Sequence, residues 1–231
     1  MDVDPLITNL AQPKLFDLGD TSFGAVELFP SVWSAAEALT NSDETIRREG
    51  LERLAELNAA RFSPLIAYLI TTRLLDPNLE IRARVIRILA EVFAPDNQGQ
   101  SAPDAVRLEL KAWLCQMRTR QIYALLQAAD FDPSSEPYIS SLLNACPYAG
   151  NHLASILADR KVPLMIRKQA AVFTGRVGYL DAIPALERIA TKLETRLNGQ
   201  QAMPFAPVDG YDNEITLLPP VKEALTLLRS P

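Results

Sequence analysis

The apolar residues of the chain recur at the spacing of an α-helix, and one helix pattern occurs three times. Segments that begin at Ile46, Ile81 and Ile166 align without gaps as IRREGLERLAEL, IRARVIRILAEV and IRKQAAVFTGRV. In each segment the isoleucine is followed four, eight and eleven residues later by positions that are mostly apolar or small. These offsets fall on one face of a helix. The pattern therefore predicts three equivalent helices whose buried faces begin at the isoleucine.

A return helix is expected after each of these three helices. Pro64 and Pro184 each lie 18 residues after the isoleucine of their own repeat. Proline is tolerated in the first turn of a helix because the N–H at that point has no intrahelical partner. In the remaining repeat the connection is longer, and its return helix is expected to begin near Asp104. The repeating unit is therefore predicted to be a helical hairpin.

Further helical segments complete an all-α chain. PSVWSAAEALT predicts a helix that caps the first hairpin, and LLPPVKEALTLLRS predicts one that closes the last. TRQIYALLQAA, SEPYISSLLNA and YAGNHLASILA predict a divergent hairpin and an extra helix between them. A single hairpin cannot bury its apolar face, so consecutive hairpins are expected to stack into a right-handed α-solenoid. We assign residues 30–231 to this domain, with a long loop at 198–214, and residues 1–29 to an acidic arm or cap.

Composition supports the helical prediction and narrows the class of partner. The 231 residues are 48% hydrophobic and include only nine glycines, which are few for a chain of many short strands. The net charge is −5, and residues 1–45 contain eight acidic groups and one basic group. Affinity for nucleic acid comes from concentrated Lys and Arg that neutralise phosphates. The charge balance therefore disfavours nucleic acid as a partner.

Cysteine usage and hydropathy bear on the compartment. Cys115 and Cys146 lie in apolar helical segments outside any CxxC pair, which favours free thiols in a reducing compartment over a disulfide. The segment MDVDPLITNL lacks the basic start and apolar core of a signal peptide. No apolar run approaches the roughly 20 residues that span a bilayer. We therefore expect a cytoplasmic protein without a membrane partner.

The repeated segments resemble HEAT repeats, particularly the bacterial HEAT-like type that is also found in phycobilin lyase proteins. The family pattern runs Asp-Pro, Val-Arg, small residues, Leu-Gly and then Asp-x-x-Ala-Ile-Pro-Ala-Leu. DPNLEIRARVIRILAEV matches its first half, and IRKQAAVFTGRVGYLDAIPALERI matches most of the remainder. Asn41 replaces the Asp of the first repeat, and the spacing from Asp159 to Arg167 is two residues longer than in the other repeats.

The resemblance implies a structural role for the repeat positions. In such repeats each arginine bonds a loop carboxylate or carbonyl of an adjacent repeat, although three arginines in register could instead bind a ligand. The positions concerned are Ile46, Arg47, Pro64, Ile81, Arg82, Ile166, Arg167 and Pro184. HEAT-like arrays act mostly as scaffolds, so the resemblance implies a non-catalytic scaffold or assembly factor that binds a protein or peptide. The alternatives are a bilin lyase-like auxiliary enzyme and, less favoured, a HEAT-like DNA-binding protein.

Candidate catalytic chemistry is sparse in the sequence. His152 is the only histidine and has no carboxylate beside it in its helical segment. DGYDNE, residues 209–214, lacks the full acidic pattern and distal Glu of a calcium loop. There is no Gly-rich phosphate loop and no Gly-x-Ser-x-Gly elbow. We therefore predict no catalytic residue, no cofactor and no metal site.

The return helices supply the predicted binding face. If Ile66, Leu69 and Ile70 are buried, then Ala67 and its polar neighbours should point away from the core. The predicted partner-binding residues are Tyr68, Thr72, Arg188 and Lys192 on these helices, with Phe205 and Tyr211 in the 198–214 loop. The two loop aromatics could instead pack across the last hairpin. The arm, with Phe16, Phe23 and Phe29 among acidic residues, either caps the first hairpin or acts as a linear interaction segment.

Overall fold

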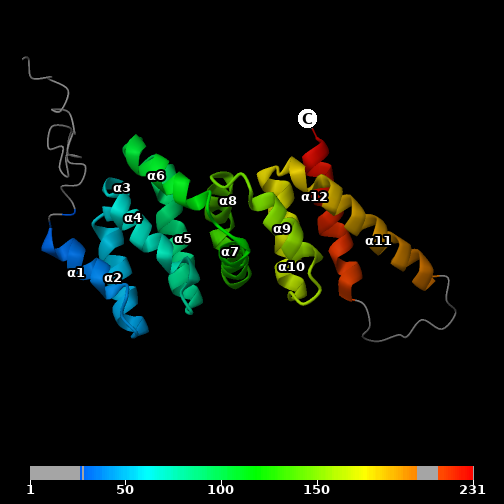
Figure 1. Ribbon diagram of the computed structural model, residues 1–231, viewed down its shortest axis with the longest axis horizontal. Coiled ribbons are helices and arrows are strands. Elements are labelled where there is room, and N and C mark those ends of the chain that lie inside the picture. The colour runs from blue at the N-terminus through cyan, green and yellow to red at the C-terminus, as the bar shows by residue number, and fades with distance from the viewer. Residues whose placement is uncertain (1–26, 28, 202–212, 231) are drawn as a thin grey trace, which may run out of the picture.

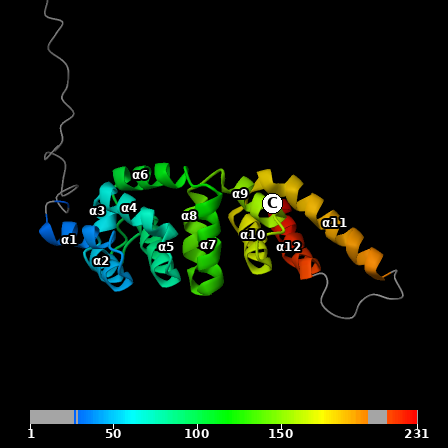
Figure 2. The ribbon, with the colours of Figure 1, turned by 60° about the horizontal axis from the view of Figure 1, so that its bottom comes forward.

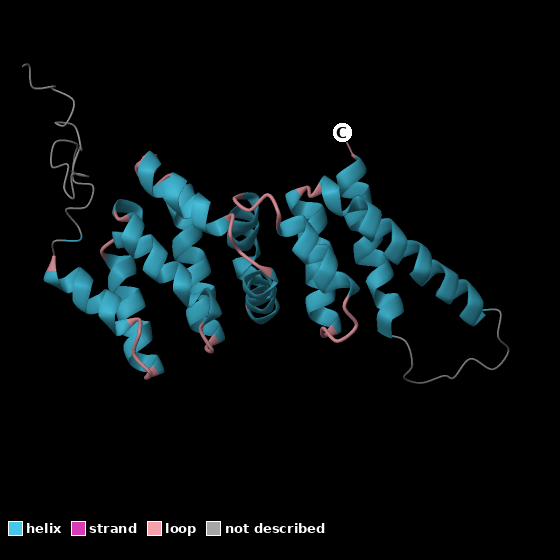
Figure 3. Cartoon of the chain, in the orientation of Figure 1, coloured by secondary structure: helices cyan, strands magenta, loops and turns pink. Residues whose placement is uncertain are grey.

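The computed structural model describes residue 27, residues 29–201 and residues 213–230, and over these residues it is all-helical. The helices follow one another along the longest axis, from α1 at one end to α11 and α12 at the other (Figure 1). Short loops join most of them (Figure 3). The α-helices of the described residues are α1 Pro30–Ala38, α2 Glu44–Glu56, α3 Ala59–Phe62, α4 Pro64–Thr71, α5 Leu79–Phe93, α6 Asp104–Leu114, α7 Thr119–Phe131, α8 Glu136–Asn144, α9 Ala149–Ala158, α10 Leu164–Val177, α11 Ile183–Gln201 and α12 Leu218–Arg229. The 3-10 helices are η2 Thr72–Leu75, η3 Pro133–Ser135, η4 Leu180–Ala182 and η5 Asn213–Leu217.

The predicted helices are present, and the all-α prediction is confirmed for the described residues. The three repeated segments form α2, α5 and α10. Pro64 is the first residue of α4, and Pro184 lies in the first turn of α11. The return helix expected near Asp104 is α6, which begins at that residue. The helices expected at the two ends are α1 and α12.

The repeat pattern matches the buried face in two of the three helices. In α5 all four pattern residues from Ile81 to Val92 are buried, and in α10 the buried set includes Ile166 and Thr174. In α2 the prediction for Ile46 is wrong, because this side chain is 39% exposed. A Cβ on Gly50 would lie 2.7 Å from the Cβ of Ala38, the last residue of α1. The packing of α1 on α2 therefore centres on Gly50 and leaves the side chain of Ile46 uncovered.

The buried side of α4 is broader than the sequence predicted. Ile66 and Ile70 are buried and Tyr68 is exposed, as expected, but Ala67 is also fully buried and Leu69 is only partly buried. The prediction for Ala67 is wrong because α4 packs against α3 and α5 and also against α6. A helix with neighbours on two sides buries more than one narrow stripe.

The bounds predicted for the loop at 198–214 are wrong at both ends. Helix α11 continues through Asn198 to Gln201, and Asn213 and Glu214 belong to η5. NGQQ has no apolar residue, so periodicity gave no signal for these four residues, although a helix can end in residues that are polar on every side. The predictions for Phe205 and Tyr211 lie outside the described residues. Of the arm, only Glu27 and Phe29 are described, and the Ser63 hydroxyl at the start of α4 donates a hydrogen bond to Glu27.

Helices α7 and α8 join the two halves of the molecule. Both pack against α5 on one side and against α10 on the other, and they lie between these helices in Figure 2. Within the described residues, no extensive contact links α1–α6 directly to α9–α12. The packing between the two halves therefore runs through α7 and α8.

The repeat arginines of α2 and α5 bond to the connection that precedes α5. Arg47 donates from Nε and Nη2 to the two carboxylate oxygens of Asp76 at 2.8 and 3.0 Å. Hydrogen bonding to Asp76 raises the pKa of the Arg47 guanidinium. Arg82 donates to the carbonyl of Asp76 and, at 2.8 Å, to Gln127 of α7. These bonds join α2 to the connection before α5, and α5 to α7.

Arg167, the repeat arginine of α10, makes equivalent contacts to other partners. Its Nε donates to the carbonyl of Leu157 in α9 at 2.8 Å, and its Nη1 pairs with Glu214 of η5 at 2.9 Å. Its side chain is only 6% exposed. Since each of the three guanidiniums is bonded to protein groups, they do not form a free ladder for a ligand.

Candidate binding site

A hollow of about 280 Å³ opens where the ends of α4 and α6 meet the start of α7. The lining residues are Tyr68, Thr71, Thr72, Leu74, Leu75, Trp113, Gln116, Met117 and Gln121. Helix α4 turns into η2 at Thr72, and this change of path leaves the space beside α6 open.

Two aromatic rings form one wall of this hollow. The ring centroids of Tyr68 and Trp113 lie 4.9 Å apart, with an angle of 51° between the ring planes. Tyr68 is 44% exposed, and Trp113 is partly buried. Tilted aromatic pairs at this distance stabilise one another, and Tyr and Trp offer a large apolar face with a polar tip. The pair is therefore a rigid apolar surface that is open to solvent.

The polar groups of the hollow are hydroxyls and amides. Thr71 and Thr72 donate their hydroxyl protons to helix carbonyls, at 2.8 and 2.6 Å. The Thr71 oxygen can therefore accept from a ligand, whereas the Thr72 oxygen already accepts from Nε of Arg73 at 3.3 Å. The Gln121 side-chain oxygen accepts from the backbone N–H of Arg118 at 3.0 Å, which orients its amide at the start of α7. None of the nine lining residues carries a carboxylate, an imidazole or an amine. The hollow thus offers apolar contact and hydrogen bonds rather than proton transfer.

A second hollow lies on the other side of the first turn of α7. Its volume is about 450 Å³, and it is lined by Thr119, Arg120, Tyr123, Ser155, Ile156, Asp159 and Val162. Helix α9 supplies its far wall. The Thr119 hydroxyl lies 2.9 Å from Nδ1 of His152, so the only histidine links α7 to α9. No carboxylate is bonded to this imidazole in the described part of the chain.

The structure brings together only some of the predicted binding residues. Tyr68 and Thr72 both line the first hollow, whereas Arg188 and Lys192 are exposed on α11 at the far end of the molecule. The sequence pattern did not lead to Trp113, Gln116 and Met117. Their spacing of three and four residues, together with one of the two tryptophans of the chain, was the signal that could have found them.

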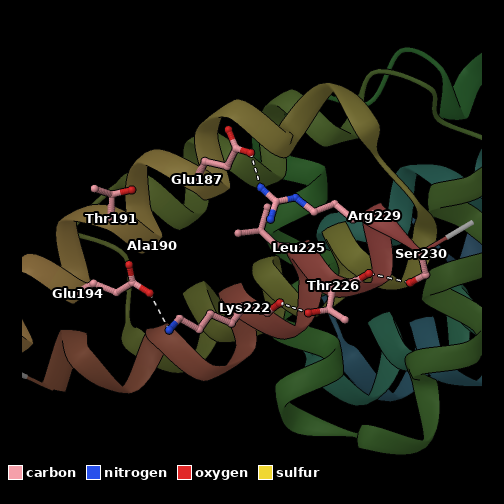
Figure 4. Close-up of a pocket in the computed structure, with 9 residues that line it drawn as sticks. All are labelled: Glu187, Ala190, Thr191, Glu194, Lys222, Leu225, Thr226, Arg229 and Ser230. Carbon is pink, nitrogen blue, oxygen red and sulfur yellow. Dashed lines mark hydrogen bonds and ion pairs between the residues drawn. The ribbon is translucent and has the colours of Figure 1, made fainter.

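A further hollow, about 660 Å³ in volume, lies between α11 and α12 (Figure 4). Two ion pairs cross it, Glu187 to Arg229 at 2.5 Å and Glu194 to Lys222 at 2.6 Å. On each helix the paired residues are seven positions apart, so they lie on one face. Leu225 in the floor is only 7% exposed. All four charged side chains of this hollow are paired with each other. These pairs join α11 to α12 at the end of the molecule.

Glu214 gathers three arginines from separate elements. Its carboxylate lies 3.2 Å from Arg160, 2.9 Å from Arg167 and 2.5 Å from Arg196. Burial alone would raise the pKa of Glu214, but hydrogen bonds from Arg167 and Arg196 outweigh it and lower the pKa. Glu214 therefore joins η5 to α10 and α11.

In the described residues no group of three or more His, Cys, Asp or Glu is placed to hold a metal ion.

Replacing Glu214 by glutamine is expected to cost about 1–2 kcal/mol at pH 7, since hydrogen bonds to a charged group are strong but two of the arginines are partly exposed to solvent. A lowered pKa stabilises the fold above the ordinary value of 4.5, and this contribution is lost as the pH falls below that value. Urea unfolding of both proteins between pH 3 and pH 7 measures the difference. Glu223→Gln, at an exposed position of α12, is the control and should lose little stability.

No protein-family model, no curated protein and no solved structure matches the chain, so comparison assigns it to no family. Among the described helices, none combines the length and the apolar character that crossing a bilayer requires. A functional assignment therefore depends on the geometry and chemistry of the hollows.

Proposed function

We propose that the chain is a non-catalytic, HEAT-like solenoid that binds a segment of another protein. The observation that carries the proposal is the exposed pair of Tyr68 and Trp113, set in a hollow whose other polar groups are uncharged. Aromatic side chains dominate the affinity of protein interfaces, and amides and hydroxyls around them suit the backbone of a peptide. The hollow fits a peptide better than a substrate that needs acid–base catalysis.

The solenoid part of the proposal rests on the repeated hairpins and on the arginines that join them. Extensive contacts link helices that are close in sequence, as expected when each hairpin packs mainly on its neighbours. Arg47 and Arg82 bond to the connection between their hairpins. A cytoplasmic setting belongs to the same proposal and is supported by Cys115 and Cys146, which are free thiols.

The rigidity of the hollow favours binding. Most of its lining residues lie on α4, η2, α6 and α7, and Met117 and Leu74 at its base are buried. A preformed surface needs little ordering when a ligand binds, so more of the contact energy contributes to affinity. This rigidity supports a binding role in which the walls of this hollow change shape little.

Selection from a random-peptide phage library on the immobilised full chain tests the proposal. We expect enriched peptides with aromatic or aliphatic anchors, and we expect Tyr68→Ala to raise their Kd at least tenfold, or about 1.4 kcal/mol. Trp33→Ala is the matched control, because Trp33 is a 47% exposed aromatic on α1 outside the hollow. Failure to enrich any peptide, or equal binding by the Tyr68 variant, would overturn the proposal.

A further inference from the structure

We infer that the bound segment is acidic and extended, and that it runs from the Tyr68–Trp113 hollow across the first turn of α7 into the hollow between α7 and α9. The inference rests on the proposed function and adds the chemistry of the partner and its path. Three features carry it: the position of the two hollows, the apolar walls of the second, and the charge of the helix turn between them.

The two hollows share one wall. Gln121 lines the first hollow, whereas Thr119, Arg120 and Tyr123 line the second. Residues 119–121 form the first turn of α7, so a chain that leaves one hollow reaches the other by crossing a single helix end. A helix with its side chains is about 10 Å across, and an extended chain rises about 3.3 Å per residue. About three residues therefore separate the side chains that enter the two hollows.

The second hollow suits an apolar side chain. Tyr123, Ile156 and Val162 supply carbon surface from α7, α9 and the loop after α9. Ile156 is only 2% exposed, whereas Tyr123 and Val162 are partly open. An aliphatic side chain of the ligand would fit here, while another apolar side chain packs on the aromatic pair in the first hollow.

The wall between the hollows is positively charged. Arg118 and Arg120 are both exposed, and in the described ranges neither forms an ion pair. Arginines on α2 and α5 differ in this respect, since Arg48 and Arg84 pair with glutamates. Among the described residues Asp159 is the only acidic one that lines either hollow, and it accepts from the backbone N–H of Lys161 at 2.9 Å. A partner whose charge complements this wall would place carboxylates against the two arginines.

An acidic peptide fits these observations better than a nucleic acid. Nucleic-acid binding draws on many Lys and Arg along a continuous track. Here Arg118 and Arg120 lie at the start of α7, one hollow has no charged group, and the other contains Asp159 as well as Arg120. Two apolar pockets with a short basic wall between them match two apolar side chains on either side of a short acidic stretch.

The test uses the full chain and fluorescein-labelled peptides in fluorescence anisotropy. The probe contains Trp-Asp-Glu-Asp-Leu, with two apolar anchors and three acidic residues between them, and the matched probe contains Trp-Lys-Arg-Lys-Leu. We expect the acidic probe to bind at least tenfold more tightly at low salt, and the preference to shrink as the salt concentration rises. The double variant Arg118→Glu with Arg120→Glu should reverse the preference.

The double variant Arg188→Glu with Lys192→Glu is the control, because it makes the same change in net charge at exposed positions of α11. It should leave the preference for the acidic probe intact. Tyr123 replaced by p-benzoylphenylalanine should crosslink to the leucine end of the acidic probe, which places that end in the second hollow.

The outcomes separate this inference from the proposed function. Equal affinity for the two probes, with binding still lost in Tyr68→Ala, would overturn the acidic inference alone. Probe binding that is unchanged in Tyr68→Ala and in the double variant of Arg118 and Arg120 would overturn both proposals. Crosslinks from position 123 to residues 1–26 of the same chain, or to a second copy, would overturn the partner peptide as occupant. Tighter binding of a single-stranded DNA oligonucleotide at the same arginines would overturn the choice of a peptide.

Discussion

Replacing Arg47 by alanine is expected to lower the free energy of unfolding by about 3–5 kcal/mol. Asp76, its partner, has a fully buried side chain, and Arg47 is only 8% exposed. The substitution removes both donors of the bidentate pair and leaves the buried Asp76 carboxylate with its bond from the Asn78 backbone N–H. It also removes the bonds from Arg47 to the carbonyls of Asn41 and Ser42. Urea unfolding followed by circular dichroism measures the loss.

Arg48→Ala provides the control for this prediction. Arg48 is the next residue of α2, and its pairs with Glu44 and Glu80 involve side chains that are about half exposed. Exposed ion pairs contribute about 0–1 kcal/mol, so this variant should lose little. If the two variants lose the same amount, the buried pair does not fasten the first hairpin to the second.

Replacing Gly175 by alanine is expected to destabilise the protein by about 2–3 kcal/mol. A Cβ at this position would lie 2.6 Å from the Cα of Ala224 in α12, closer than Cβ atoms approach other atoms in proteins. The obstacle is the backbone of a helix, so it cannot rotate out of the way as a side chain could. Helices α10 and α12 must move apart, and the apolar contact between them is weakened. The expected observation is a lower urea midpoint with reduced protection of α12 in hydrogen exchange.

Gly199→Ala is the matched control for Gly175. Gly199 is an exposed residue of α11, and a Cβ there would meet no atom within 4 Å. Alanine is a better helix former than glycine, so this variant should gain about 0.5–1 kcal/mol. The same chemical change thus has opposite signs at the two positions. A loss at both positions would mean that close packing is not the reason for Gly175.

The helices could be predicted from the sequence because their signals are local. Apolar spacing located α2, α5 and α10, and proline positions located the starts of α4 and α11. Burial of single residues was less predictable, because it depends on neighbours that come from elsewhere in the chain. Ile46 is exposed since α1 ends beside Gly50, and Ala67 is buried since α6 covers a second side of α4.

The candidate site could be predicted only in part. The exposed face of α4 indicated Tyr68 and Thr72, but the facing wall required knowledge of how α6 lies against α4. Glu214 shows the same limit, because its sequence neighbourhood suggested an incomplete calcium loop. Arg160, Arg167 and Arg196, which surround its carboxylate, lie 54, 47 and 18 residues away in the chain. A linear pattern cannot reveal such a convergence.

The central position of α7 and α8 has a mechanical consequence. In the described residues, extensive contact between the two halves runs only through this pair, so bending of the molecule concentrates there. The first hollow belongs to the half that contains α4 and α6, and the second has a wall from α9 in the other half. A ligand that fills both hollows would contact both halves and restrict bending at α7 and α8. Binding at the site and the curvature of the whole molecule would then depend on each other. A few residues at the start of α7 would determine both.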